Sequence, residues 1–315
     1  MNDFLFSLNA TMPVFLVIVL GWILKKTNMI SEGFVSSADK LMFRIALPVL
    51  LFRDISSINI KKDFNFKFVA FCFCSTLAFI LIIWLLSEIF IKDKKIIGSF
   101  VQGSFRGSAA VLGIAFAQNI YGSSGLVPMM IVASVPLFNI FSVIVLARSD
   151  AKKSGEMRGL MKDTLVGIVT NPIIIGIILG MICACLPIKF PVIIDKTMST
   201  VGSLSTPLAL VTMGAGFSLG KVMEKAKPTI VASIIKLVIL PIVFLPIAIA
   251  MGFRNEALVA ILILLGAPST PSGYVMTKNM NNDYVLSSGV IVLTTLLSSI
   301  SITVIIFILK NYSFI

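Results

Sequence analysis

The segment Gly266–Gly273 reads GAPSTPSG and directly follows a long apolar run. Prolines lack a backbone N–H and break helices, whereas hydroxyl side chains can hold a ligand by hydrogen bonds. Irregular backbone at membrane depth persists only where protein buries it or where it lines a watery cavity. The segment therefore predicts a broken membrane helix at a polar binding site, with a proline-kinked structural helix as the alternative. The candidate residues are Pro268, Ser269, Thr270, Pro271 and Ser272.

Two cations, Arg106 and Lys236, lie deep within other apolar runs, and those runs contain no acidic residue to neutralise them. A charge at the bilayer centre costs about 2.5–3.5 kcal/mol, so such residues usually have a function. Uncompensated cations favour an anionic substrate, and the planar fork of arginine suits a carboxylate. We expect Arg106 to bind that carboxylate. For Lys236 we expect a second anion contact or a coupling site, with a structural tie between helices as the alternative.

The composition is that of a polytopic membrane protein. Of the 315 residues, 57% are hydrophobic and 13% are charged, whereas soluble domains have about 45–50% and 25%. The net charge of +12 lies mostly in short loops between apolar runs, which is a topology signal and does not indicate nucleic-acid binding. Histidine is absent, and the four cysteines lie in apolar segments at spacings that favour neither a disulfide nor a metal clamp. We expect no metal and no cofactor.

Ten segments are long and apolar enough to be membrane helices, which need about 20 such residues. The sequence therefore predicts an all-α membrane protein with ten transmembrane helices. The segments are 8–25, 37–53, 68–91, 97–120, 125–147, 164–186, 193–218, 228–251, 256–280 and 284–309.

The two halves of the sequence match each other when one is shifted by 159 residues. We expect five-helix repeats at residues 1–147 and 164–315, joined by a cytoplasmic linker at 148–163. Because five is odd, the repeats must cross the membrane in opposite directions, as in many secondary transporters. The repeat mate of Gly266–Gly273 is 106–113, which has glycines but no proline. The matching pairs are Pro13 with Pro172, Gly21 with Gly180, Pro48 with Pro207, and Gly107 with Gly266.

Lysine and arginine are more numerous in the connections on the linker side than in those on the other side. Positive residues favour the cytoplasm. We therefore expect a multi-pass protein of the plasma membrane with both termini outside the cell.

Five stretches, in order along almost the whole chain, resemble the auxin efflux carrier family of membrane transporters. They are LMFRIALPVLLF (41–52), SFRGSAAVLGIAFAQNIYG (104–122), NPIIIGIILG (171–180), STPLALVTMGAGFSLG (205–220) and LLGAPSTPSGYVMTKNMNND (264–283). The resemblance implies two inverted five-helix repeats whose fourth and ninth helices are unwound and cross. It also implies a scaffold and a moving transport unit. The missing proline in span four departs from the crossed-proline pattern of the plant carriers.

The resemblance also implies a carboxylate substrate, because bacterial members resemble permeases for malate and malonate, and plant members export auxin. Carried over residue by residue, the substrate region comprises Arg106, Gly107, Ser108, Pro268, Ser269, Thr270, Pro271 and Ser272. We expect spans one, two, six and seven to form the scaffold, and the other six spans to form the transport unit.

The sequence thus predicts a secondary transporter of mono- or dicarboxylates, working by alternating access, with a proton or sodium as co-substrate and the lipid bilayer as surroundings. A sodium-coupled organic-anion symporter of bile-acid type is the alternative, and an intramembrane enzyme is a remote one. We expect no enzymatic activity, and a homodimer is compatible with the sequence.

Overall fold

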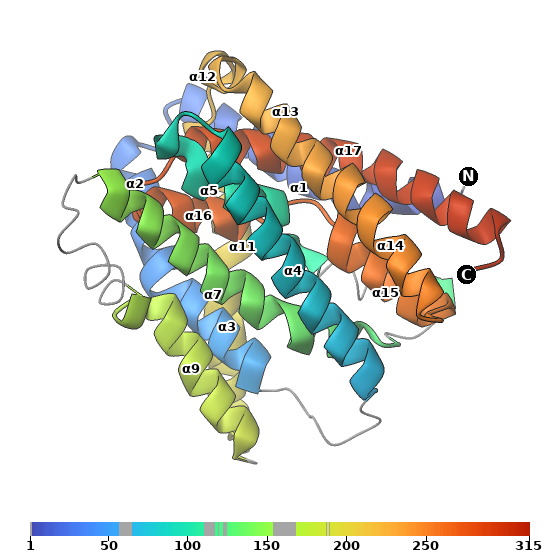
Figure 1. The fold of residues 1–315 in the computed structure, drawn as a ribbon. Helices are drawn as coiled ribbons and strands as arrows, with labels where there is room; N and C mark the ends of the chain where they lie inside the picture. The colour runs from blue at the N-terminus through green and yellow to red at the C-terminus, as the bar shows by residue number, and fades with distance from the viewer. Residues whose placement is uncertain are drawn as a thin grey trace.

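The computed structural model describes residues 2–56, 65–109, 117–118, 120–121, 125–153, 168–186, 188 and 190–315. These residues form helices and no strand, and both chain ends lie at the same end of the molecule (Figure 1). In chain order the helices are α1 (Asn2–Lys26), α2 (Glu32–Leu41), α3 (Leu47–Ser56), α4 (Phe66–Phe90), α5 (Ile97–Phe105), α7 (Val127–Lys153), α9 (Pro172–Cys185), α10 (Val192–Ser203), α11 (Ser205–Gly216), α12 (Leu219–Glu224), α13 (Ala226–Ile234), α14 (Leu240–Ala250), α15 (Asn255–Gly266), α16 (Pro271–Asn279) and α17 (Tyr284–Asn311).

Helical residues occur in each of the ten segments that the sequence marks as spans. Five helical stretches of the described chain are long and apolar enough to cross a membrane, namely 66–90, 127–150, 226–250, 255–279 and 284–311. The linker at 148–163 lies outside the described residues beyond 153, and so do positions 110–113 of the repeat mate.

The outward faces of these helices are apolar. Leu85 on α4, Ile242 on α14 and Phe307 on α17 are each more than 60% exposed. Exposed large apolar residues gathered on several helices mark contact with an apolar partner. Together with helices of spanning length, they fit a bundle surrounded by lipid.

Two helices contain a π turn, and each turn lies just before a proline. The turns are η1 (Met42–Ala46), which precedes Pro48, and η3 (Ile235–Ile239), which precedes Pro241. A proline cannot donate to the carbonyl four residues earlier, so the regular hydrogen-bond ladder stops there. The N–H of Leu47 instead bonds Met42, and that of Leu240 bonds Ile235, each five residues back. The second turn contains Lys236.

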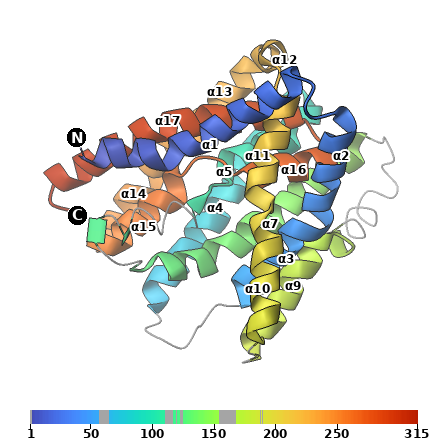
Figure 2. The same cartoon turned by 180° about the vertical axis from the view of Figure 1, so that it is seen from behind.

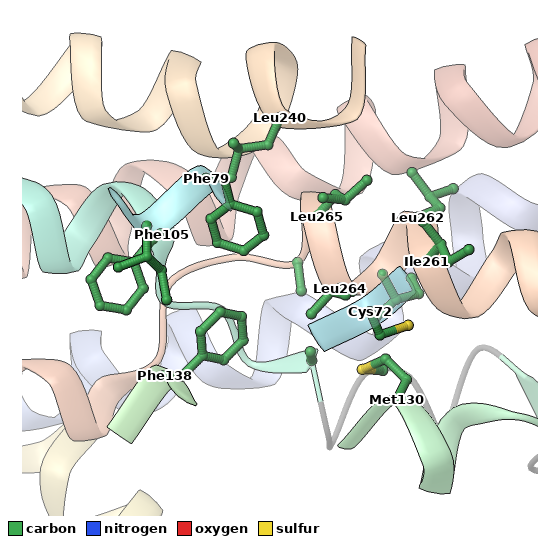
Figure 3. Packing of buried hydrophobic residues seen from close by; sticks show 14 of the residues in the cluster. Cys72, Phe79, Phe105, Met130, Phe138, Leu240, Ile261, Leu262, Leu264 and Leu265 are labelled. Atoms are coloured by element: carbon green, nitrogen blue, oxygen red, sulfur yellow. The ribbon is translucent and has the colours of Figure 1, made fainter. Parts of the chain in front are cut away.

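Two apolar clusters make up the interior. The larger joins α4, α5, α7, α13–α15 and α17. In it Phe105 of α5 stacks on Phe138 of α7 with ring centroids 6.0 Å apart (Figure 3). The smaller joins α1, α3, α9 and α11, and also takes in residues of α7, α16 and α17. Figure 2 shows α10 and α11 beside α2 and α9, on the side of this smaller cluster.

Glycines allow very close helix contacts in the smaller cluster. A Cβ on Gly21 of α1 would lie 2.3 Å from the carbonyl oxygen of Val211 in α11. A Cβ on Gly180 of α9 would lie 2.9 Å from the carbonyl oxygen of Phe52 in α3. Small residues let helix backbones approach closely within membranes. The two repeat-mate glycines thus hold the two helix pairs α1–α11 and α9–α3.

We predict that Gly21→Ala destabilises the purified protein. The added methyl must displace the backbone of α11, and such overpacking costs about 1–3 kcal/mol. The matched control is Gly220→Ala, because a Cβ there would meet nothing within 4 Å. Thermal unfolding in detergent should show a midpoint several degrees lower for the first variant and no decrease for the second. Equal midpoints would show that the contact is not tight.

Candidate functional site

The helix break that the two prolines predict is present. The helix α15 ends at Gly266, the backbone is extended at Ala267 (φ −64°, ψ 144°) and Thr270 (φ −89°, ψ 140°), and α16 starts at Pro271. Proline is favoured in the first turn of a helix, where its missing N–H has no partner to lose. The segment therefore ends one half-helix and starts another.

A second break ends α5 without a proline. The helix stops at Phe105, and Arg106 is extended (φ −74°, ψ 123°). The N–H of Ser108 donates to the carbonyl oxygen of Pro268 at 2.8 Å, so the two breaks bond to each other directly. The side chain of Ser269 adds a bond of 2.7 Å to the carbonyl oxygen of Gly103. Each break thus satisfies backbone groups that the other leaves open.

The guanidinium of Arg106 is held by two other helices. Its Nη1 donates to Ser142 Oγ at 3.0 Å, and its Nη2 donates to Asn139 Oδ1 at 2.7 Å, both on α7. Nη2 also donates to Ser272 Oγ at 2.9 Å, in the first turn of α16. These bonds fix the plane and the direction of the guanidinium at the point where the two breaks meet.

The positive charge of Arg106 has no acidic partner among the described residues, although the side chain is only 6% exposed. Its Nε is buried and has no hydrogen-bond acceptor in the described chain. Buried charges are normally paired, and buried donors are normally bonded. The side chain is therefore poised for a negatively charged ligand.

A cavity of about 190 Å³ lies against both breaks. All eight residues that the sequence marks for substrate contact line it, from Arg106–Ser108 on one break to Pro268–Ser272 on the other. The opposite wall comes from α1, α3 and α11, through residues such as Thr11, Leu50 and Thr206. The structure thus brings the predicted residues together around one space.

Three cavity residues were missed by the sequence analysis: Asp54 on α3, Asn139 on α7 and Thr295 on α17. Asn139 is a single amide in an apolar run, and this could have marked it, because polar groups within membranes are costly unless used. Asp54 has the position of a helix-end residue in the sequence, with no signal that it faces the site. The hydroxyl of Thr295 is buried and has no partner in the described chain.

Lys236 is fully buried, but it is not among the residues that line the cavity. Its ammonium donates to the carbonyl oxygen of Leu264 at 3.2 Å, in the last turn of α15. It also lies next to Gly107, where a Cβ would be 2.9 Å from Nζ. The structure thus places this cation behind the crossing of the two breaks, on the far side from the ligand space.

The described residues contain no group of three or more cysteine, aspartate or glutamate residues that could hold a metal ion. The polar chemistry of the site rests instead on one guanidinium, on the hydroxyls and on backbone groups. Such groups bind and orient an anion.

We predict that Ser269→Ala destabilises the protein, because it removes the bond to Gly103 and leaves a buried carbonyl unpaired. Such a loss costs about 1–3 kcal/mol. Ser203→Ala is the matched control, because this exposed serine only bonds Thr200 within its own helix. Unfolding in a denaturing-detergent titration should separate the two variants. If both unfold like the unmodified protein, the hydroxyl tie does not stabilise the crossing.

Comparison with known proteins gives one family and several relatives. The family model described as membrane transport protein matches residues 6–306. The uncharacterized transporter YfdV of Escherichia coli (strain K12) is 22% identical over 291 residues, which cover 88% of this chain and 89% of that protein. The uncharacterized transporter MJ1031 of Methanocaldococcus jannaschii is 22% identical over 299 residues, with 92% and 95% covered.

The matched region includes both breaks, the cavity and all the helices around it. The chain is a multi-pass membrane protein, and it belongs to the membrane transport protein family, the auxin efflux carrier family that its motifs resemble.

Proposed function

We propose that the protein is a secondary transporter that carries small organic anions, mono- or dicarboxylates, across the plasma membrane by alternating access. The observation that carries this proposal is the buried guanidinium of Arg106, which lines a cavity and has no acidic partner in the described chain. A carboxylate bound there would supply the missing charge.

Other groups around the cavity favour the same chemistry. The helix α16 starts at the cavity with Pro271, and helix N-termini attract anions through their free N–H groups and dipole. The Thr295 hydroxyl and the Arg106 Nε both lack partners in the described chain and can donate to a ligand. The site would thus offer several donors to one carboxylate group.

For the architecture we propose ten membrane spans in two inverted repeats, residues 1–147 and 164–315, joined by the linker 148–163. The repeat-mate glycines support this, because Gly21 packs span one on span seven and Gly180 packs span six on span two. These are the two contacts that a two-fold axis would exchange. The close bond between Ser108 and Pro268 fits an axis that passes through the crossing.

We further propose that the smaller apolar cluster belongs to the scaffold and the larger one to the transport unit. The cavity then lies between them, with Arg106 on the moving side and Asp54 on the scaffold side. Movement of one unit against the other would carry the bound anion from one side of the membrane to the other.

The two sides of the crossing differ in a way that suits this mechanism. On the side of the termini, Lys67 Nζ donates to the carbonyl of Met251, and the N–H of Asn255 bonds Phe314. Asp54 lies on this side, at the end of α3 that leads to α4. On the other side, Lys278 of α16 pairs with Asp39 of α2 at 2.6 Å. We propose that this ion pair closes the linker side, which is cytoplasmic if both termini lie outside.

For Lys236 we retain two roles, a coupling site that exchanges a proton during transport and a tie for the end of α15. Its position behind Gly107 favours action through the crossing over contact with the ligand. Uptake by a Lys236→Gln variant at different pH gradients separates these roles, because only a coupling site would remove the proton dependence.

We predict that the reconstituted protein takes up labelled malate or malonate, and that Arg106→Ala lowers this uptake by at least about thirtyfold. Removing one partner of a buried charge pair costs about 2 kcal/mol or more. Arg106→Lys should give an intermediate rate, because lysine keeps the charge but loses the planar fork. Proteoliposome uptake, with the pH gradient, the potential and sodium set separately, measures both the effect and the coupling ion.

The matched control for this experiment is Arg44→Ala, because Arg44 is exposed and does not line the cavity. Uptake by this variant should stay close to that of the unmodified protein. Absence of uptake of either acid under every gradient would withdraw the substrate class, whereas equal loss in both arginine variants would withdraw the role of Arg106.

We predict that Asp39→Asn opens the linker side more often. The substitution removes the ion pair but leaves Lys278 partly in contact with water, since its side chain is 26% exposed. A cysteine in place of the buried Met276 on α16, in a background without the native cysteines, would report the opening. Its reaction with a water-soluble maleimide should accelerate several-fold.

The control for the ion pair is Arg53→Gln, which breaks the bond between Arg53 and Asp195 inside the proposed scaffold. This variant should leave the labelling rate unchanged. A rate that rises equally in both variants would indicate general loosening and would contradict a closing role for the pair.

A further inference from the structure

We propose that Asp54 makes the cavity selective for carboxylates that carry a single negative charge. The inference rests on the proposed function and adds to it the charge state of the substrate. Of the described residues that line the cavity, Arg106 and Asp54 are the charged ones, with one charge of each sign. The remaining lining residues are apolar or carry hydroxyl, amide or backbone groups.

The two charges lie on different parts of the cavity wall. Arg106 lies where the two breaks meet, and its direction is fixed by Asn139, Ser142 and Ser272. Asp54 is in the last turn of α3, within the opposite wall. A substrate whose carboxylate contacts Arg106 therefore extends its other end toward the part of the wall that carries Asp54.

The charges near Asp54 do not cancel its effect on a ligand. Its neighbour Arg53 is engaged by Asp195 of α10 through two bonds, of 3.0 and 3.4 Å. Besides Asp195, α10 contains Lys196, and its neighbours α9 and α11 contain no charged residue. Within the described chain, the charged groups near this end of α3 are thus Arg53, Asp195 and Lys196, with Arg106 across the cavity.

Electrostatics then separates three forms of ligand. A monoanion bound to Arg106 neutralises a buried cation and brings no second charge to Asp54. A dianion of the same size gains the same contact but places its second carboxylate in the region of another negative charge. In a partly shielded cavity this repulsion is large enough to weaken binding by at least about tenfold. A dicarboxylic acid that has kept one proton behaves like the monoanion.

The consequence for transport is that a dicarboxylic acid would be carried in its singly protonated form. Its apparent affinity then rises as the pH falls through the second dissociation of the free acid. One proton travels on the substrate itself, so net proton movement accompanies the transport of the acid without a separate proton site on the protein.

The test compares two ligands with one carbon skeleton, malonate and monomethyl malonate. The ester keeps a single charge at every pH above its first dissociation, whereas malonate is a dianion at alkaline pH. We would measure the Kd of each for the purified protein at alkaline pH by titration calorimetry. The unmodified protein should bind the ester at least about tenfold more tightly than malonate.

Three variants decide the origin of this preference. In Asp54→Asn the ratio of the two Kd values should fall close to one, mainly because malonate binds better. Asp54→Glu keeps the charge and should keep the preference. Glu88→Gln removes an acid that does not line the cavity and pairs with Arg148 instead, so it should leave the ratio unchanged.

The outcomes separate the two proposals. If both acids bind in an Arg106-dependent manner but Asp54→Asn leaves the ratio unchanged, the selectivity proposal is overturned and the organic-anion carrier stands. If Asp54→Asn weakens both ligands equally, the residue is structural, and the proposal is again wrong. If neither acid binds to the unmodified protein, the proposed function fails and the selectivity proposal fails with it.

Discussion

The backbone bond from the N–H of Ser108 to the carbonyl of Pro268 is the contact on which the rest of the site depends. Two chain segments stop being helical at this depth, and each exposes N–H and C=O groups that lipid cannot satisfy. They solve the problem by bonding each other. Ser269 and Thr294 complete the arrangement, the first through Gly103 and the second by accepting from the Ser269 N–H. A polar cavity can exist beside the crossing because the crossing itself has few unmet bonds.

The same constraint accounts for the two buried cations. Lys236 donates to Leu264 at the end of α15, where the last carbonyls of a helix have no partner in the chain. Arg106 instead faces the cavity and keeps one donor without a partner in the described chain. One cation thus completes the protein's own hydrogen bonding, and the other remains incomplete without a ligand. Their similar depth in the sequence hides this difference.

Much of the site could be predicted from the sequence because its signal is local. Prolines, glycines and hydroxyls in an apolar run are conspicuous without any knowledge of the fold, and all eight predicted contact residues line the cavity. The ends of the helices were also close to the apolar segments. Asp54 and Asp39 were missed for a physical reason. Each lies on an ordinary-looking stretch, and its importance arises only when another helix brings Arg106 or Lys278 near it.

The surroundings of the Asp39–Lys278 pair have a consequence for how the protein responds to its medium. The carboxylate is only 4% exposed, and the lysine also contacts the rings of Tyr274 and Tyr284. Dissolved ions screen charges at a surface but act little on a pair enclosed by aromatic rings. The balance between the closed and open forms is therefore set by the hydration of one carboxylate. A cell whose internal salt rises and falls with osmotic stress would keep the same balance throughout.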